Sequence, residues 1–93
     1  MLINYCIFET TPYLKDLDKN FEGRNEKIKI KLREFVYLQL KISPHYGSNI
    51  KKLKNYKPET WRYRVGDYRL FYEIDEQEKI VYLIAIDSRG NSY

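Results

Sequence analysis

The segment WRYRVGDYRLFYEI, residues 61–74, limits the possible folds more than any other part of the chain. Its first five residues alternate between apolar and basic side chains, which is typical of a strand with one buried and one open face. The buried face takes Trp61, Tyr63 and Val65, and the opposite face takes Arg62 and Arg64. The Gly-Asp pair that follows predicts a two-residue turn, and the next apolar run predicts a returning strand at 68–74. The segment therefore predicts an antiparallel hairpin.

Two further apolar runs predict strands outside this hairpin. Residues 2–8 (LINYCIF) combine β-branched and aromatic side chains, and residues 79–86 (KIVYLIAI) form the most apolar run of the chain. An acidic turn at 75–78 joins the second run to the hairpin, so we expect three consecutive antiparallel strands. The remaining residues, 87–93, read as a polar tail.

Two helices are predicted between the first strand and the hairpin. Thr10-Thr11-Pro12 is a typical helix start, and apolar residues follow at helical spacing, which predicts a first helix at 11–20. Residues 24–42 are ambiguous, because lysines alternate with apolar residues in the first part as they would in a strand. The apolar residues from Ile28 to Val36 also recur at helical spacing, and nineteen residues without Gly or Pro are long for a strand. We therefore predict a second helix here.

The predicted order of elements is β-α-α-β-β-β. A Pro- and Gly-bounded loop at 43–49 and a basic turn at 51–54 lead from the second helix to the hairpin. Ninety-three residues suffice for one hydrophobic core, so we expect a single domain spanning residues 1–93. The fold class is α+β: a compact domain with two N-terminal helices packed on one face of a mainly antiparallel sheet.

The composition excludes several classes of protein. The chain has one cysteine, Cys6, and one histidine, His45, which excludes an internal disulfide, a multi-thiolate metal site and the usual zinc or histidine-triad sites. We expect Cys6 to be a small buried hydrophobic residue and His45 to have a structural or surface role. No apolar run reaches about 18 residues and the N-terminus does not resemble a signal peptide. These features predict a cytoplasmic protein that uses no metal or other cofactor and has no membrane partner.

The charge is distributed unevenly along the chain. The net charge is +4, but residues 24–69 carry 13 Lys and Arg against four acidic residues, whereas both ends of the chain are acidic. A basic region with aromatic neighbours suits a polyanion such as nucleic acid. The alternative is that these charges only form a solvated, lysine-rich helix face.

Three arginines fall on the predicted hairpin. Arg62 and Arg64 share one face, and Arg69 lies just across the turn, so a tight turn brings the three together. Like charges this close repel unless an anion lies between them, and the guanidinium group matches phosphate oxygens. A phosphate pocket is one interpretation; the other is that each arginine pairs with a surface acid such as Glu73 or Glu59.

The sequence resembles the RelE/ParE superfamily of bacterial and archaeal toxin–antitoxin systems. The most specific part of the resemblance is WRYRVGDYRLFYEID followed by KIVYLIAIDSRGNSY; it extends to the TPYLKDLDK helix and to the PHYG loop, and so covers nearly the whole chain. Proteins similar to RelE are ribosome-dependent endoribonucleases that cut messenger RNA without a metal. Their reaction, attack of a ribose 2′-OH on the adjacent phosphate, needs cationic groups for the developing charge.

The resemblance also implies roles for individual residues. The catalytic set would be Arg62, Arg64, Arg69, Arg89 and Tyr93. The residues that contact RNA would be Lys51, Lys52 and Lys54. Ser88 stands where many relatives carry His or Lys, and arginine is a poor general base, so the proton acceptor is left open among Tyr93, water and ribosomal RNA.

Three functions remain open under this resemblance. The first is a RelE-like messenger RNA interferase, whose partners would be the ribosome, messenger RNA and a RelB-like antitoxin in a hetero-oligomeric complex. The second is a ParE-like inhibitor of DNA gyrase. The third is a non-toxic homologue that only binds its antitoxin. In each case the antitoxin would wrap the basic region with an extended, acidic segment.

Overall fold

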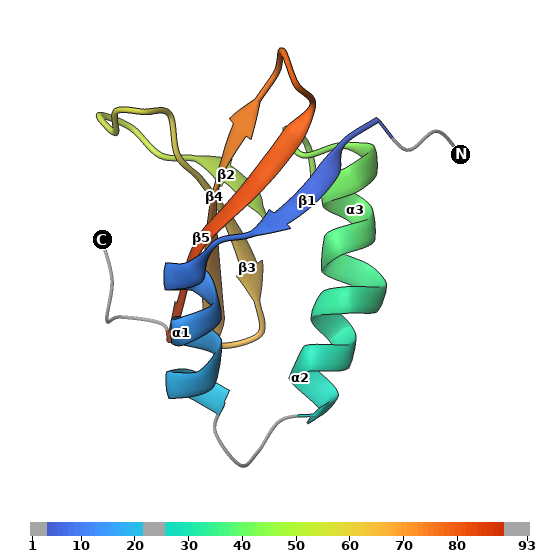
Figure 1. Cartoon of the computed structure of the whole chain (residues 1–93), viewed down its shortest axis with the longest axis vertical. Coiled ribbons are helices and arrows are strands. Elements are labelled where there is room, and N and C mark those ends of the chain that lie inside the picture. Colours follow the sequence, from blue (N-terminus) through green and yellow to red (C-terminus); the bar gives the residue numbers. More distant parts are fainter. Residues whose placement is uncertain (1–3, 22–25, 89–93) are drawn as a thin grey trace.

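A computed structural model describes residues 4–21 and 26–88 of the chain. Helices lie against one side of a five-stranded sheet whose strand order is β1-β5-β4-β3-β2 (Figure 1). The elements are β1 (Cys6–Glu9), α1 (Thr11–Phe21), α2 (Glu26–Lys31), the π-helical segment η1 (Leu32–Val36), α3 (Tyr37–Ile42), β2 (Ile50–Lys52), β3 (Trp61–Val65), β4 (Tyr68–Asp75) and β5 (Ile80–Ser88). The predicted α+β class with helices on a mainly antiparallel sheet is confirmed.

The sheet is mixed because the first strand, β1, lies beside the last strand, β5. β1 pairs parallel with β5, while β5, β4, β3 and β2 are antiparallel to their neighbours. The predicted basic turn at 51–54 is wrong in part, since Ile50–Lys52 forms a strand that pairs with β3. Three residues are too few to show an alternating pattern. They form a strand only because they pair with β3. The N–H of Arg64 extends this pairing by donating to the carbonyl of Asn49 at 2.9 Å.

The prediction of a helix over the ambiguous lysine-rich stretch is confirmed. α2, η1 and α3 follow one another without a break from Glu26 to Ile42. Leu32, Val36 and Leu40 are buried against the sheet, so the helical spacing and not the alternation matches the burial. The wider π turn shifts the register within the stretch, and Phe35 lies on the outside with 64% of its surface exposed.

The core lies between the helices and the sheet. Its largest fully buried side chains include Tyr13 from α1, Leu40 from α3 and Tyr72 from β4. The Tyr37 hydroxyl donates to Glu9 at 2.7 Å and accepts from the Tyr13 hydroxyl at 2.6 Å, so both helices are tied to the end of β1. Burial raises the pKa of Tyr13 and of Tyr37, which keeps both hydroxyls protonated as this chain of hydrogen bonds requires.

The turn between β3 and β4 sets the register of the hairpin. Val65 pairs with Tyr68, which leaves a two-residue loop. Gly66 has a φ of +59°, the left-handed backbone that a type II′ turn requires at its first central position. The order Gly-Asp therefore suits this turn, and the predicted hairpin is confirmed.

The loop after α3 is attached to the sheet by several side chains. The buried Tyr72 hydroxyl donates to the carbonyl of Pro44 at 2.6 Å. His45 forms an ion pair with Glu76 and packs edge-on against Trp61, with 5.3 Å between ring centroids. These contacts join the loop to β3, to β4 and to the turn that follows β4.

The expectation that Cys6 is buried is wrong. β1 is at the edge of the sheet, and Cys6 is exposed. Its neighbour Ile7 packs against the core, and successive side chains of a strand point to opposite faces, so Cys6 points away from the helices. The first strand was predicted over residues 2–8; the structure has it at 6–9, and residues 1–3 lie outside the described part. No helix within residues 4–21 and 26–88 is long and apolar enough to cross a membrane.

Candidate functional site

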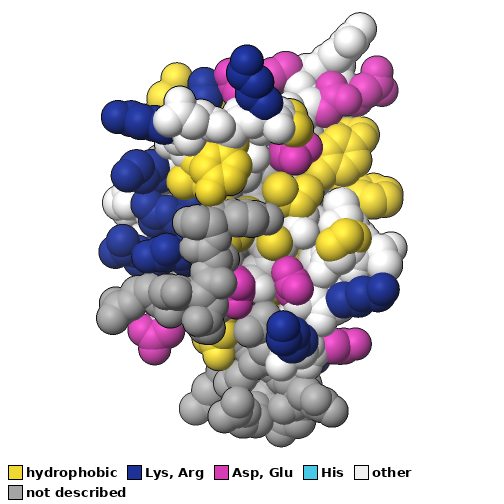
Figure 2. All heavy atoms as spheres, turned by 90° about the vertical axis from the view of Figure 1, so that its left-hand side faces the viewer, with side chains coloured by type: hydrophobic (Ala, Val, Ile, Leu, Met, Phe, Trp, Pro, Cys, Tyr) yellow, Lys and Arg dark blue, Asp and Glu magenta, His cyan; other side chains and the backbone are white. Residues whose placement is uncertain are grey.

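The face of the sheet that lies away from the helices carries the predicted arginines. Tyr63 and Val65 of β3 and Leu70 and Tyr72 of β4 are buried in the core on the helix side. Because side chains alternate, the residues between them lie on the opposite, open face. Figure 2 shows this open face, where Lys and Arg side chains gather on one side and hydrophobic side chains on the other.

Strand pairing brings the arginines together. Arg64 lies directly opposite Arg69, and Arg62 lies opposite Phe71 on β4 and opposite Lys51 on β2. A hollow of about 230 Å³ opens among these side chains. Its lining comes from three strands and the loop after β2: Lys51, Leu53, Arg62, Arg64, Arg69 and Phe71.

The electrostatics of the hollow favour an anion. Partial burial and then repulsion by Arg64 and Arg69 lower the pKa of Arg62 below its usual value, which shows how closely the three charges lie. Among the residues that the structure describes, no ion pair includes any of these arginines. The acid nearest to them by register is Asp87, opposite Arg69 on β5. Arg62 also donates from Nη1 to the carbonyl of Asn49 at 3.3 Å, which holds it in place.

Within residues 4–21 and 26–88, neither Glu59 nor Glu73 forms an ion pair with these arginines. Glu59 pairs with Lys52 at 3.0 Å and is therefore engaged elsewhere. Three guanidinium groups and one ammonium group in a hollow of this size can hold a phosphate through forked hydrogen bonds. They cannot accept a proton, because arginine stays protonated at every relevant pH.

The other predicted site residues lie in different places. Lys52 is opposite Trp61, on the helix side of the sheet, and its ammonium lies 5.9 Å from the centre of the Trp61 ring. Lys54 lines a separate, more open hollow of about 830 Å³ formed by residues 52–59. The predicted residues Arg89 and Tyr93 lie outside the described part of the chain.

Phe71 was missed by the sequence reasoning although a signal existed. It is only 2% exposed, yet it lies on the arginine side of the sheet and not in the main core. Its position two residues after Arg69 gives it the same face as that arginine. An apolar side chain at the floor of the hollow lowers the local dielectric and strengthens the attraction between the arginines and an anion.

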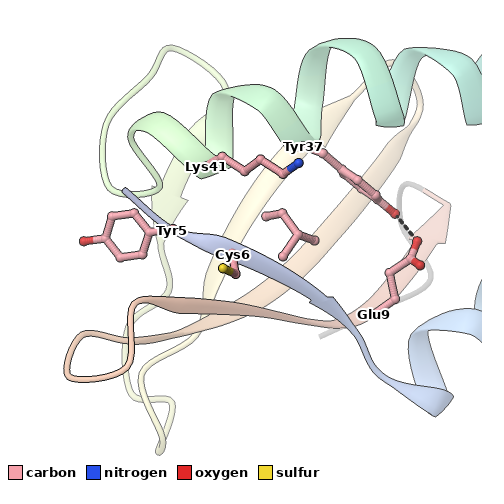
Figure 3. A pocket seen from close by; sticks show the side chains of 6 residues that line it. Tyr5, Cys6, Glu9, Tyr37 and Lys41 are labelled. Atoms are coloured by element: carbon pink, nitrogen blue, oxygen red, sulfur yellow. Dashed lines mark hydrogen bonds between the residues drawn. The ribbon is translucent and has the colours of Figure 1, made fainter. Parts of the chain in front are cut away.

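A second groove runs along the free edge of β1. It has a volume of about 450 Å³ and is lined by Tyr5, Cys6, Ile7, Glu9, Tyr37 and Lys41 (Figure 3). The N–H groups of Cys6 and Thr10 point towards β5, where they donate to the carbonyls of Lys79 and Leu83. Those of the alternate residues therefore point away from β5, towards the groove. Such an edge is able to pair with an extended segment.

The comparisons with known proteins agree with this fold. Residues 10–93 match the family model of the ParE toxin of the type II toxin–antitoxin system parDE. The chain belongs to this toxin family, within the RelE/ParE superfamily. It is thus a toxin of a type II toxin–antitoxin system. No curated protein sequence matches it.

Several solved structures are similar over nearly the whole chain. The toxin–antitoxin complex RelBE2 from Mycobacterium tuberculosis contains a chain that is 29% identical, with a TM-score of 0.74 and coverage of 94% of this chain and 100% of that one. The archaeal RelE–RelB complex from Pyrococcus horikoshii gives 20% identity, a TM-score of 0.68 and coverage of 96% and 99%. A mutant RelE toxin of E. coli in the free state gives 19% identity, a TM-score of 0.70 and coverage of 95% of this chain and 85% of that one. The last two comparisons establish the fold.

Proposed function

We propose that this toxin is a metal-independent, ribosome-dependent endoribonuclease that cleaves messenger RNA by attack of a 2′-OH on the adjacent phosphate. The observation that carries the proposal is the cluster of Arg62, Arg64 and Arg69 around one hollow beside Lys51, where residues 4–21 and 26–88 provide no ion pair for the three arginines. A toxin that only blocked a protein surface would have no need for mutually repelling charges around one hollow.

The geometry suggests how the residues divide the work. Arg64 and Arg69 lie opposite each other on the adjacent strands β3 and β4, so both can hold non-bridging oxygens of one phosphate. Arg62 is held by the carbonyl of Asn49 and lies deeper, where its charge can meet the negative charge that develops at phosphorus in the transition state. Lys51 is placed to hold a neighbouring phosphate and so to fix the strand in line.

The proton transfers require groups other than these. Arg89 would stabilise charge as well, and Tyr93 would stack on a base or transfer a proton. A tyrosine close to several arginines has a lowered pKa and can accept a proton more readily. Water or ribosomal RNA is the alternative acceptor, and an acceptor on ribosomal RNA would make cleavage depend on the ribosome.

A defined translation system tests the proposal. The purified protein is added to ribosomes that translate one message, and primer extension maps the cuts. We expect cleavage that needs ribosomes and that disappears in the variant Arg64→Ala/Arg69→Ala. The control, Lys31→Ala/Arg33→Ala, removes two exposed basic residues from the helical layer and should cleave like the wild type. Absence of cleavage by folded wild-type protein would contradict the proposal.

Gyrase inhibition is the second candidate, and the family match favours it, because the matching model describes a ParE toxin. A supercoiling assay with DNA gyrase separates the two functions. Inhibition of supercoiling without cleavage of the message would establish the second candidate. If the protein showed neither activity, it would be a homologue that only binds an antitoxin.

We also propose an antitoxin as the partner. The similar chains from Mycobacterium tuberculosis and Pyrococcus horikoshii were solved in complexes with antitoxins. The basic face suits an acidic segment, and the free edge of β1 suits an extended one. A complex of this kind would be hetero-oligomeric and would cover the arginine hollow.

A further inference from the structure

A pair of aromatic side chains lies on the open face of the sheet, away from the core. Phe8 of β1 lies opposite Tyr82 of β5, and their ring centroids are 5.5 Å apart with the ring planes tilted by 58°. Phe8 is 53% exposed, although phenylalanine is normally buried. The sequence alone suggested a buried strand here, so the exposure of this pair is a property of the fold.

Alternation along the strands shows that the pair is separate from the core. Val81 and Leu83, on either side of Tyr82, are fully buried on the helix side. Ile7, next to Phe8, packs against the same core. Tyr82 and Phe8 must therefore point to the opposite face, the one that carries the arginines.

The aromatic pair and the arginine hollow lie on the same face of the sheet. Arg62 is opposite Phe71 on β4, and Tyr82 is opposite Glu73, two residues further along the same strand. Two strand spacings across and two residues along place Tyr82 about 12 Å from Arg62 at the level of the backbone. In Figure 2 the basic side chains lie towards one side of this face and hydrophobic side chains towards the other.

We propose that Phe8 and Tyr82 form a stacking platform for one unpaired base of the RNA strand whose phosphate occupies the arginine hollow. This inference rests on the proposed ribonuclease function and adds a subsite to it. Aromatic rings on an open sheet face stack with any base, because every base has a π-face. Glu73 lies beside Tyr82 and repels phosphate, so the base and not the backbone of the strand is directed onto the rings.

The test measures binding of a short single-stranded RNA without the ribosome. The RNA carries 2′-O-methyl groups, which prevent cleavage, and a fluorescent label for anisotropy. We expect Phe8→Ala/Tyr82→Ala to weaken binding about tenfold, the usual size of a lost base stack. Phe35→Ala is the control, since Phe35 is more than half exposed, as Phe8 is, but lies on the helical layer, and it should bind like the wild type. Circular dichroism and thermal melting check that each variant is folded.

Two further readouts separate stacking from a general loss of affinity. Removing one base at a time from the RNA should weaken binding to the wild type about tenfold at a single position, and should have no further effect at that position in the double variant. The dependence of affinity on salt should be unchanged in the double variant, because no phosphate contact is lost, whereas Arg64→Ala should reduce it.

Three results would overturn the stacking platform. They are wild-type affinity in the double variant, an abasic effect that persists in the double variant, and no binding of RNA by the wild type at low salt. Cleavage on the ribosome is measured separately, so the two proposals can fail independently. Platform-dependent binding without cleavage would contradict the ribonuclease function alone, and cleavage without an effect of Phe8 would contradict the platform alone.

Discussion

Removal of one arginine from the hollow should make the protein more stable while it abolishes the activity. Arg64 and Arg69 lie directly opposite each other, and burial followed by repulsion from both lowers the pKa of the neighbouring Arg62. At a separation of about 6 Å in a water-like dielectric, two unit charges repel by about 0.7 kcal/mol. Arg64 is exposed, so screening at moderate salt reduces this to about 0.5 kcal/mol.

Arg64→Gln keeps the length and polarity of the side chain and removes the charge. We expect its melting temperature to exceed that of the wild type by about 2–4 °C at low salt, from the usual relation between free energy and melting temperature for a domain of this size. The gain should vanish at about 1 M salt, where the Debye length is about 3 Å. Inorganic phosphate should stabilise the wild type more than the variant, because an anion bound in the hollow relieves the same repulsion.

Differential scanning fluorimetry at several salt concentrations measures both effects. Arg33→Gln is the control, because it removes an exposed arginine from η1, far from the arginine cluster, and should be close to neutral. The reasoning is refuted if Arg64→Gln is no more stable than the wild type at low salt, or if its gain is unchanged at high salt.

Three other predictions concern the framework of the site. Tyr72→Phe leaves the buried carbonyl of Pro44 without its hydrogen bond and should lower the free energy of unfolding by about 1–3 kcal/mol in urea titrations; an unchanged midpoint would contradict this. Gly66→Ala has open space for its methyl group but must adopt a φ of +59°, so it should cost about 1–2 kcal/mol through backbone strain alone, and a neutral result in the same titration would refute it. The hydrogen bond from Tyr5, followed by the contact with His45, lowers the pKa of Glu76 in the folded state, so its stabilising effect is present above pH 4.5 and is lost as the pH falls through the lowered value. Glu76→Gln should therefore remove part of the acid destabilisation seen in unfolding titrations below that pH, and identical acid profiles for the two proteins would contradict the assignment.

Properties that depend on neighbouring residues in the chain were predicted correctly. The alternation in WRYRV and the Gly66-Asp67 turn placed Arg62, Arg64 and Arg69 on one face, because the direction of a strand side chain follows from its position in the strand. For the same reason the faces of Tyr63 and Val65 were predicted. The roles assigned to these arginines, and to Arg89 and Tyr93, remain predictions.

The helix at 26–42 shows where local pattern was insufficient. Its lysines alternate with apolar residues as in a strand, and only the burial of Leu32, Val36 and Leu40 against the sheet decides in favour of the helix. Helices of this length gain most of their stability from packing of one face, which is a tertiary property. The exposure of Phe35 beside the π turn could not be read from spacing either.

The sequence by itself therefore determined the first helix, the hairpin and the face that carries the arginines. Only the tertiary structure decided which strands lie next to one another. β2 exists because three residues pair with β3, and that pairing adds Lys51 to the hollow. β1 joins the sheet at its edge beside β5, and this position exposes Cys6 and sets Phe8 against Tyr82. Strand neighbours far apart in the chain are chosen by the packing of the whole core, and no local pattern encodes that choice.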